Sequence, residues 1–156
     1  MEQRIDAYAK RPDAMKAIYA MEMYLAKSSL DHQLLHLIKY RVSQINGCAY
    51  CLDMHSKDLR AGGETEQRIY TLPAWRETPF FTDRERAALE WAEAVTLVSQ
   101  THVPDEVYEA VRKEFSEDEL IDLTLAVAAI NTWNRMAISF RTTAGTYQPG
   151  QYSTAA

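Results

Sequence analysis

The sequence predicts an all-α domain, and three observations lead to this prediction. Apolar residues recur at helical spacing along most of the chain, and residues that favour helix N-caps precede several of these stretches. Strand-like alternation is absent, and the five glycines and five prolines fall where helices would end. With 156 residues, 47% apolar and 25% charged, the chain is expected to form one globular domain over 1–156, with its core at about 30–140 and a tail at 142–156.

The first half of the chain is expected to hold three main helices. Pro12 suits the first turn of a helix. The apolar stripe of this helix is formed by Ala14, Ile18, Met21 and Leu25. Ser28 and Asp31 precede a second helix that should end at Asn46-Gly47. Its apolar residues are Leu34, Leu35, Ile38, Val42 and Ile45. A third helix should run from near Cys48 to Gly62-Gly63.

The second half is expected to hold a short helix at 65–70, a loop at 73–79 and three further helices. Thr82 and Glu85 form a capping box. The helix they open carries Ala88, Trp91, Ala92, Val95 and Val98 on one side. Pro104 should start a short helix, and a second capping box at 116–119 should open a long one. The apolar residues of the long helix are Leu120, Leu123, Val127, Ile130, Met136 and Phe140.

Charge and hydropathy argue against two classes of partner. The formal net charge of −5 argues against nucleic acid and against an anionic membrane surface. No apolar run reaches the roughly 20 residues that span a bilayer. The first residues lack the apolar region of a secretion signal, so a cytoplasmic location is expected. In that compartment a lone C-x-x-C pair is typical of a catalytic or metal-binding site rather than of a structural disulfide.

The two cysteines of the chain stand beside a histidine, in the order Cys48, Cys51 and His55. At the start of a helix this spacing places all three on one face. The helix N-terminus and a nearby imidazole would both lower a thiol pKa, and the two sulfurs could close a reducible disulfide. Two alternatives stay open. The cysteines could be small buried core residues, or they could bind zinc with His55 and a fourth ligand from His32, His36 or His102.

Three stretches together resemble a known family: residues 41–55, 85–94 and 128–137. They are similar to the alkylhydroperoxidase D-like branch of the carboxymuconolactone decarboxylase superfamily, and the resemblance extends from about Leu30 to Phe140. It implies an all-helical fold and dimer-based homo-oligomers, trimers or hexamers. It also implies thiol-dependent peroxidase activity of the peroxiredoxin type, that is, alkyl hydroperoxide reduction.

The resemblance implies roles for the two cysteines. It assigns Cys51 as the peroxidatic thiol and Cys48 as the resolving thiol. Pairing of Cys51 with His55 one turn away favours the same assignment, whereas the helix dipole alone favours Cys48. We therefore predict that Cys51 attacks, Cys48 resolves and His55 carries protons.

Two positions depart from the family pattern. The family glutamate twelve residues before the first cysteine is His36 here, and the family histidine before the second cysteine is Tyr50. An imidazole accepts and donates protons near neutral pH, so His36 is a candidate for the relay. Glu90 and Glu93 are alternative carboxylates.

The predicted partners are a small-molecule hydroperoxide and an external thiol reductant, either thioredoxin-like or lipoyl, with no cofactor and no metal. The alternative is a non-peroxidase of the same fold, either a decarboxylase-like enzyme or a redox-sensing binding protein. True lactone decarboxylases of the superfamily lack the cysteine pair, which disfavours the former. An apolar pocket is expected from Tyr40, Tyr50 and Trp133.

The stretch after Pro12 is rich in methionine and tyrosine, which is relevant to whether the protein forms an oligomer. These residues are Met15, Tyr19, Met21, Met23 and Tyr24. Because a small domain has a limited interior, these side chains are expected to pack against another subunit. Alternatively, they close over the long helix that follows Ser116 in the same chain.

Overall fold

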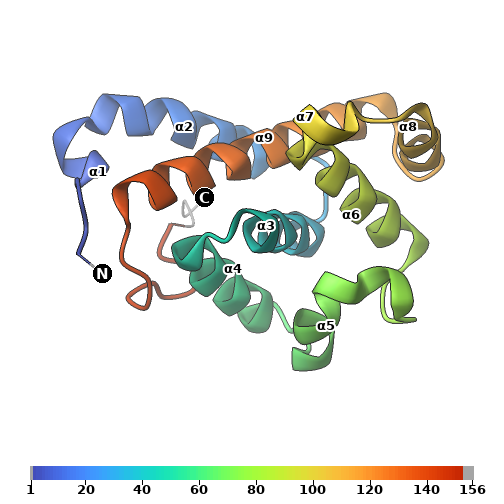
Figure 1. Ribbon diagram of the computed structural model, residues 1–156, viewed down its shortest axis with the longest axis horizontal. Coiled ribbons are helices and arrows are strands. Elements are labelled where there is room, and N and C mark those ends of the chain that lie inside the picture. The colour runs from blue at the N-terminus through green and yellow to red at the C-terminus, as the bar shows by residue number, and fades with distance from the viewer. Residues whose placement is uncertain (1, 153–156) are drawn as a thin grey trace.

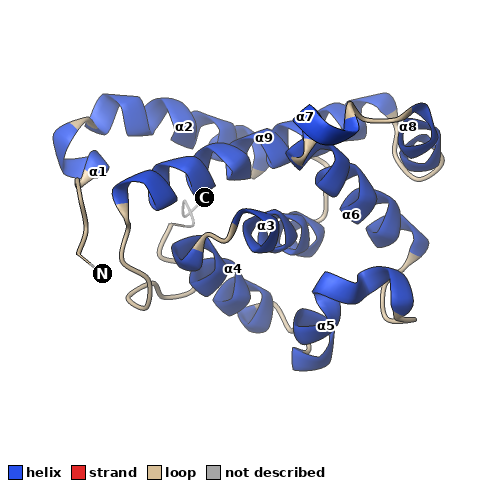
Figure 2. Ribbon diagram, in the orientation of Figure 1, coloured by secondary structure: helices blue, strands red, loops and turns tan. Residues whose placement is uncertain are grey.

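The structure, a computed structural model, describes residues 2–152 and consists of helices, turns and loops, with no strand in this range (Figure 2). The all-α prediction is confirmed. The elements are α1 (Ala7–Lys10), α2 (Pro12–Leu25), α3 (His32–Asn46), α4 (Ala49–Ala61), α5 (Glu66–Thr71), the 3₁₀ helix η1 (Leu72–Glu77), α6 (Asp83–Thr96), α7 (Val98–Thr101), α8 (Asp105–Arg112) and α9 (Glu117–Phe140). In the described part of the chain, no helix is long and apolar enough to cross a membrane.

Helix α3 lies at the centre of the domain and packs against α4, α6 and α9 (Figure 1). Its apolar stripe and that of α9 meet in the larger of two buried clusters, where Ile38, Val42 and Ile130 have no exposed surface. A smaller cluster beneath α5 and η1 is built around Leu59, Leu72 and Trp75. The central position of α3 places it directly against α4, which carries the cysteine motif, and against α9.

The helix ends follow the expected capping residues. Asp31 caps α3 by accepting a hydrogen bond from the Leu34 amide at 2.9 Å, and both predicted capping boxes, at Thr82 and Ser116, are formed. Gly47 ends α3 with φ of 69°, a left-handed conformation that glycine adopts at little cost. Cys48 follows directly as the N-cap of α4. The single glycine between the helices folds α4 back along α3 and fixes where the cysteine motif lies.

Two local expectations were wrong, and one short helix was not anticipated. The segment 73–79 contains η1 rather than a loop, because Pro73 suits its first turn and Trp75 is buried against the smaller cluster. Helix α6 ends at Thr96, so Val98 does not extend its apolar side and is 52% exposed in α7. Helix α1, capped by the Asp6 side chain, was not anticipated.

The two ends of the chain lie against α9 and α4. Helix α2 packs on α9, and its Met15 and Leu25 are buried while Met23 and Tyr24 remain exposed. The segment after α9 has no helix as far as residue 152, as its composition indicated, yet its Tyr147 is buried. Residues 153–156 of the expected tail lie outside the described residues.

Candidate active site

The two cysteines lie at the N-terminus of α4, where backbone amides have no partners within the helix. Cys48 is the N-cap, and its sulfur accepts a hydrogen bond from the Cys51 amide at 3.4 Å. Both thiols are free and buried. The partial positive charge of the helix end and the amide hydrogen bond therefore both favour a thiolate at Cys48.

A buried amide from α9 supports the pair. Asn134 donates to Ser43 Oγ at 3.1 Å and accepts from Asn46 Nδ2 at 2.8 Å. Its side chain also acts on both sulfurs: it helps to lower the pKa of Cys48 and partly opposes the rise in the pKa of Cys51. Sequence reasoning did not assign this role, although Asn134 lies in one of the three stretches that resemble the family.

The pKa values of the two thiols are shifted in opposite directions. A hydrogen bond from Cys51 lowers the pKa of Cys48 to about 7, even though burial raises it. The same hydrogen bond, together with burial, raises the pKa of Cys51. The two sulfurs titrate as a coupled pair, so the first proton is lost near neutral pH and the second is shared between the two sulfurs.

Alkylation should report this shared charge. The rate of modification by iodoacetamide is expected to rise with pH through a midpoint near 7, because the thiolate is the nucleophile and its pKa is about 7. Asn134→Leu should move the midpoint upward by removing a hydrogen bond to the thiolate. Mass spectrometry across a pH series measures both. A wild-type midpoint at the value of an ordinary thiol would contradict the prediction.

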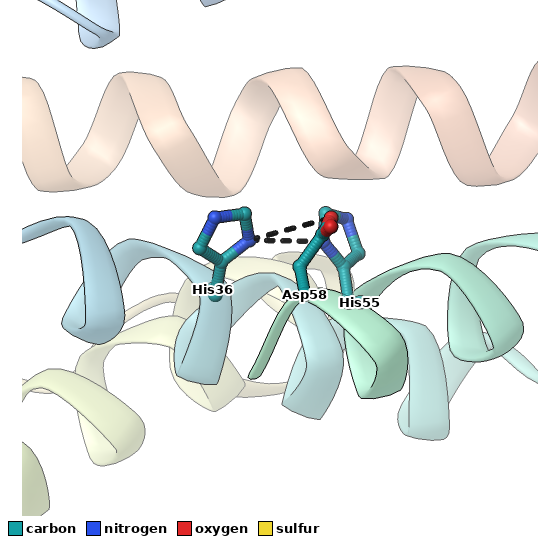
Figure 3. Close-up of side chains that lie close together, drawn as sticks. All are labelled: His36, His55 and Asp58. Atoms are coloured by element: carbon teal, nitrogen blue, oxygen red, sulfur yellow. Dashed lines mark hydrogen bonds and ion pairs between the residues drawn. The ribbon is translucent and has the colours of Figure 1, made fainter. Parts of the chain in front are cut away.

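The structure brings His36 and His55 together across α3 and α4. Their Nδ1 atoms lie 3.4 Å apart, and His36 Nδ1 lies 3.9 Å from Asp58 Oδ2 (Figure 3). Burial lowers the pKa of both histidines, and the nearby Lys39 charge lowers it further, although the Asp58 carboxylate partly opposes the shift of His36. Both imidazoles are therefore neutral at pH 7, and their contact allows a proton to pass from one ring to the other.

Asp58 belongs to the same group, although sequence reasoning did not select it. Its Oδ1 accepts a hydrogen bond from the Tyr147 hydroxyl at 2.7 Å. The sequence spacing could have indicated it, since Asp58 lies three residues after His55 and thus on the same helix face. The contact from Tyr147, which comes from the segment after α9, could not be inferred from spacing.

A cavity of about 610 Å³ opens beside these groups. In the described part of the chain its lining includes Cys51, His55 and His36 but not Cys48. The walls come mainly from α1, α2, α3, α4, α9 and the segment after α9. The aromatic lining residues are Tyr8, Tyr19, Tyr50, Trp133, Phe140, Tyr147 and Tyr152. A small molecule in the cavity would therefore meet Cys51 rather than Cys48.

Two of the three aromatic residues expected at the pocket are there. Tyr50 and Trp133 line the cavity, whereas Tyr40 packs against the smaller core cluster. Trp133 stacks on Tyr8 with ring centroids 6.2 Å apart. Its Nε1 donates to Glu22 Oε1 at 3.1 Å, which orients a carboxylate at the cavity wall.

Glu22 also forms an ion pair with Lys39, and both residues line the cavity. Lys39 is only 8% exposed, so this pair is largely removed from water. The alternative carboxylates Glu90 and Glu93 lie elsewhere. Arg76 lies 3.5 Å from Glu90 and 2.6 Å from Glu93, and neither glutamate lines the cavity described above.

Comparison with known proteins gives consistent matches. The sequence model of the carboxymuconolactone decarboxylase family matches residues 12–94. The uncharacterized protein YdfG of Bacillus subtilis is 48% identical over 139 residues, which are 89% of this chain and 95% of YdfG.

Two solved structures are similar over most of the chain. One is ATU0492 of Agrobacterium tumefaciens, a protein of unknown function proposed to be the antioxidant defence protein AhpD. It has 45% sequence identity and a TM-score of 0.90, covering 94% of this chain and 100% of that one. The other is an uncharacterized peroxidase-related protein from Silicibacter sp. TM1040. It has 27% identity and a TM-score of 0.80, covering 93% of this chain and 77% of that one.

Proposed function

This chain belongs to the carboxymuconolactone decarboxylase family, and from that premise we propose that it is a dithiol peroxidase. Its substrates would be hydrogen peroxide or organic hydroperoxides. The proposal depends mainly on the arrangement of the buried C-x-x-C pair. The pKa of the Cys48 thiol is lowered to about 7, and the Cys51 sulfur lines an aromatic cavity beside two neutral histidines. The similarity to peroxidase-related structures supports the same reaction class.

The first step would use Cys51 as the nucleophile. Proton transfer to Cys48 gives the Cys51 thiolate, which attacks the terminal peroxide oxygen. An S–O bond forms, the O–O bond breaks, and the alkoxide or hydroxide that leaves takes up one proton. The product on the protein is a sulfenic acid at Cys51.

The second step would form the disulfide between Cys48 and Cys51. Cys48 gives up the proton that it took from Cys51 and attacks the sulfenic sulfur as a thiolate. An S–S bond forms, and the hydroxide that leaves takes up a proton and becomes water. Two thiols and one hydroperoxide thus give one disulfide, one alcohol and one water. An external dithiol would then reduce the disulfide in two thiol–disulfide exchange steps.

His55 and His36 would move the protons. The Cys51 thiol and the leaving oxygen both react at the cavity wall that these rings line. The 3.4 Å contact between the rings gives a path from His55 towards the more exposed His36. In this proposal His36 takes the place of the family glutamate in the relay.

The proposed reaction also needs an electron donor and a reducing compartment, and we propose that the protein is an oligomer. A thioredoxin-like or lipoyl protein would supply the electrons, and a cytoplasmic location would keep the pair reduced between turnovers. The chain would act as a dimer-based homo-oligomer, a trimer or hexamer. The exposed Met23 and Tyr24 on α2 offer apolar surface for such contacts. Light scattering that gives a monomer at micromolar concentration would contradict the assembly.

Peroxide consumption with a dithiol donor tests the function. The wild-type protein should consume hydrogen peroxide and cumene hydroperoxide catalytically, and mass spectrometry of the oxidised chain should show a Cys48–Cys51 disulfide. A disulfide that forms once without turnover would instead indicate a redox-sensing protein. Two free thiols after peroxide treatment would overturn the redox assignment altogether.

Substitution of His36 tests the relay. His36→Ala should slow peroxide turnover by roughly 10²-fold, the usual contribution of a positioned proton-transfer group. His36→Glu, which restores the family residue, should recover a large part of that loss. Steady-state kinetics over pH 5–9 measures both, with His102→Asn as a matched histidine control at an exposed position. Equal rates for wild type and His36→Ala would remove His36 from the mechanism.

A further inference from the structure

Three side chains in the cavity wall converge on one point from two helices. We propose that His36, His55 and Asp58 form a binding site for a divalent transition-metal ion, with Zn²⁺ as the ion it suits best. The ligand atoms Nδ1 of His36, Nδ1 of His55 and a carboxylate oxygen of Asp58 all lie within 4.8 Å of one another. Figure 3 shows the His36 ring facing His55 and Asp58, with dashed lines from its nitrogen to each of them.

The spacing of the two nitrogens fits zinc. Imidazole nitrogens lie ~2.0–2.1 Å from Zn²⁺, so two of them at a tetrahedral angle are about 3.3 Å apart. The Nδ1 atoms of His36 and His55 are 3.4 Å apart. Asp58 Oδ2 lies 3.9 Å from His36 Nδ1, so the carboxylate must move closer to complete the third ligand position.

The surroundings match those of open metal sites. Two histidines and one carboxylate leave a fourth position free in tetrahedral zinc sites, and all three residues line the cavity, so that position faces it. The Tyr147 hydroxyl holds Asp58 Oδ1 at 2.7 Å and leaves Oδ2 free to bind. Such outer hydrogen bonds orient the ligands of metal sites.

The local charges are compatible with a cation. Asp58 contributes one negative charge and the histidines bind as neutral rings. The positive charge of Lys39 acts on both rings, and it is offset by the ion pair with Glu22. His32 also faces His36 from the same helix. The buried Nε2 of His55 has no hydrogen-bond partner among the described residues, so Nδ1 carries its visible contacts.

This site differs from the cysteine-based zinc site considered from the sequence. Among residues 2–152, the close group of possible ligands comprises His36, His55 and Asp58 and does not include the two cysteines. A metal on His55 Nδ1 would withdraw that ring from proton transfer. Metal occupancy and peroxide reduction would therefore exclude each other, and zinc would act as a reversible inhibitor.

Zinc titration against a chromophoric chelator tests the site without any turnover measurement. Wild type should bind one Zn²⁺ per chain. Asp58→Asn and His36→Gln should each weaken binding by at least ~10²-fold, and Tyr147→Phe by roughly 10-fold. These variants avoid replacing the buried His55, and circular dichroism confirms their folding. His102→Asn and the double variant Cys48→Ser/Cys51→Ser should bind like wild type.

Two binding results would reject the proposed zinc site. No stoichiometric binding to wild type at micromolar zinc, or binding unchanged in Asp58→Asn and His36→Gln, rejects it. Binding lost in the double serine variant assigns the ion to the cysteines instead. Cobalt substitution gives a second readout, because the proposed ligands predict visible d–d bands without a sulfur charge-transfer band. A protein inactive with peroxides would leave these binding outcomes unaffected.

Discussion

Replacing Cys51 with serine is expected to reduce peroxide consumption to the rate of the uncatalysed reaction between peroxide and donor. A serine hydroxyl is not ionised at neutral pH, so neither the S–O bond nor the later disulfide can form. Cys51 is the sulfur that lines the cavity, and its loss therefore removes the first chemical step. A coupled assay with a dithiol donor measures the loss.

Cys48→Ser is the matched variant, and it should fail at a different step. The Cys51 thiol can still attack once, although without its partner to accept the proton. A sulfenic acid should therefore accumulate at Cys51 and be trapped by dimedone, with mass spectrometry locating the adduct. If the adduct instead forms at Cys48 in the Cys51→Ser variant, Cys48 is the attacking thiol, as the helix dipole alone favours.

Glu22→Ala is expected to destabilise the fold by about 3–5 kcal/mol, because it leaves the ammonium group of Lys39 buried without its counter-charge. Lys39 is 8% exposed and pairs with Glu22 at the cavity wall. The same substitution also removes the acceptor of the Trp133 indole. Urea denaturation followed by circular dichroism measures the change in the free energy of unfolding.

Two control variants separate this effect from a general sensitivity of α2. The double variant Glu22→Leu/Lys39→Met removes both charges and should recover most of the stability. Asp13→Asn breaks the exposed pair with Lys16, whose side chains are 90% and 79% accessible, and should cost less than about 0.5 kcal/mol. A loss for Glu22→Ala as small as that for Asp13→Asn would show that Lys39 is solvated.

The helices and the motif could be read from the sequence because their determinants are local. Capping boxes at Thr82 and Ser116, and the left-handed Gly47, act within one turn of the chain. The cysteine spacing likewise fixes Cys51 and His55 on one face of α4. The resemblance pointed to position 36, and the structure places His36 against His55.

Most of the missed features depend on packing between distant segments. Asn134 reaches the sulfurs from α9, and Glu22 reaches Lys39 from α2, so neither contact leaves a local pattern. Helix η1 forms where two prolines suggested a loop, because burial of Trp75 outweighs the local preference. Val98 fits the helical period of α6, yet the helix stops before it at Leu97.

Segments from both ends of the described chain line the cavity. The Tyr152 carbonyl accepts from Tyr19 at 3.0 Å, and the Tyr152 hydroxyl lies 3.0 Å from that of Tyr50. The reacting groups come from α3 and α4, supported by α9, whereas much of the wall comes from α1, α2 and the segment after α9. Different segments of the chain therefore determine the reaction and the shape of the substrate that fits the cavity. Exchanging residues 142–152 for those of a relative should change which molecules fit while the thiol pKa stays the same.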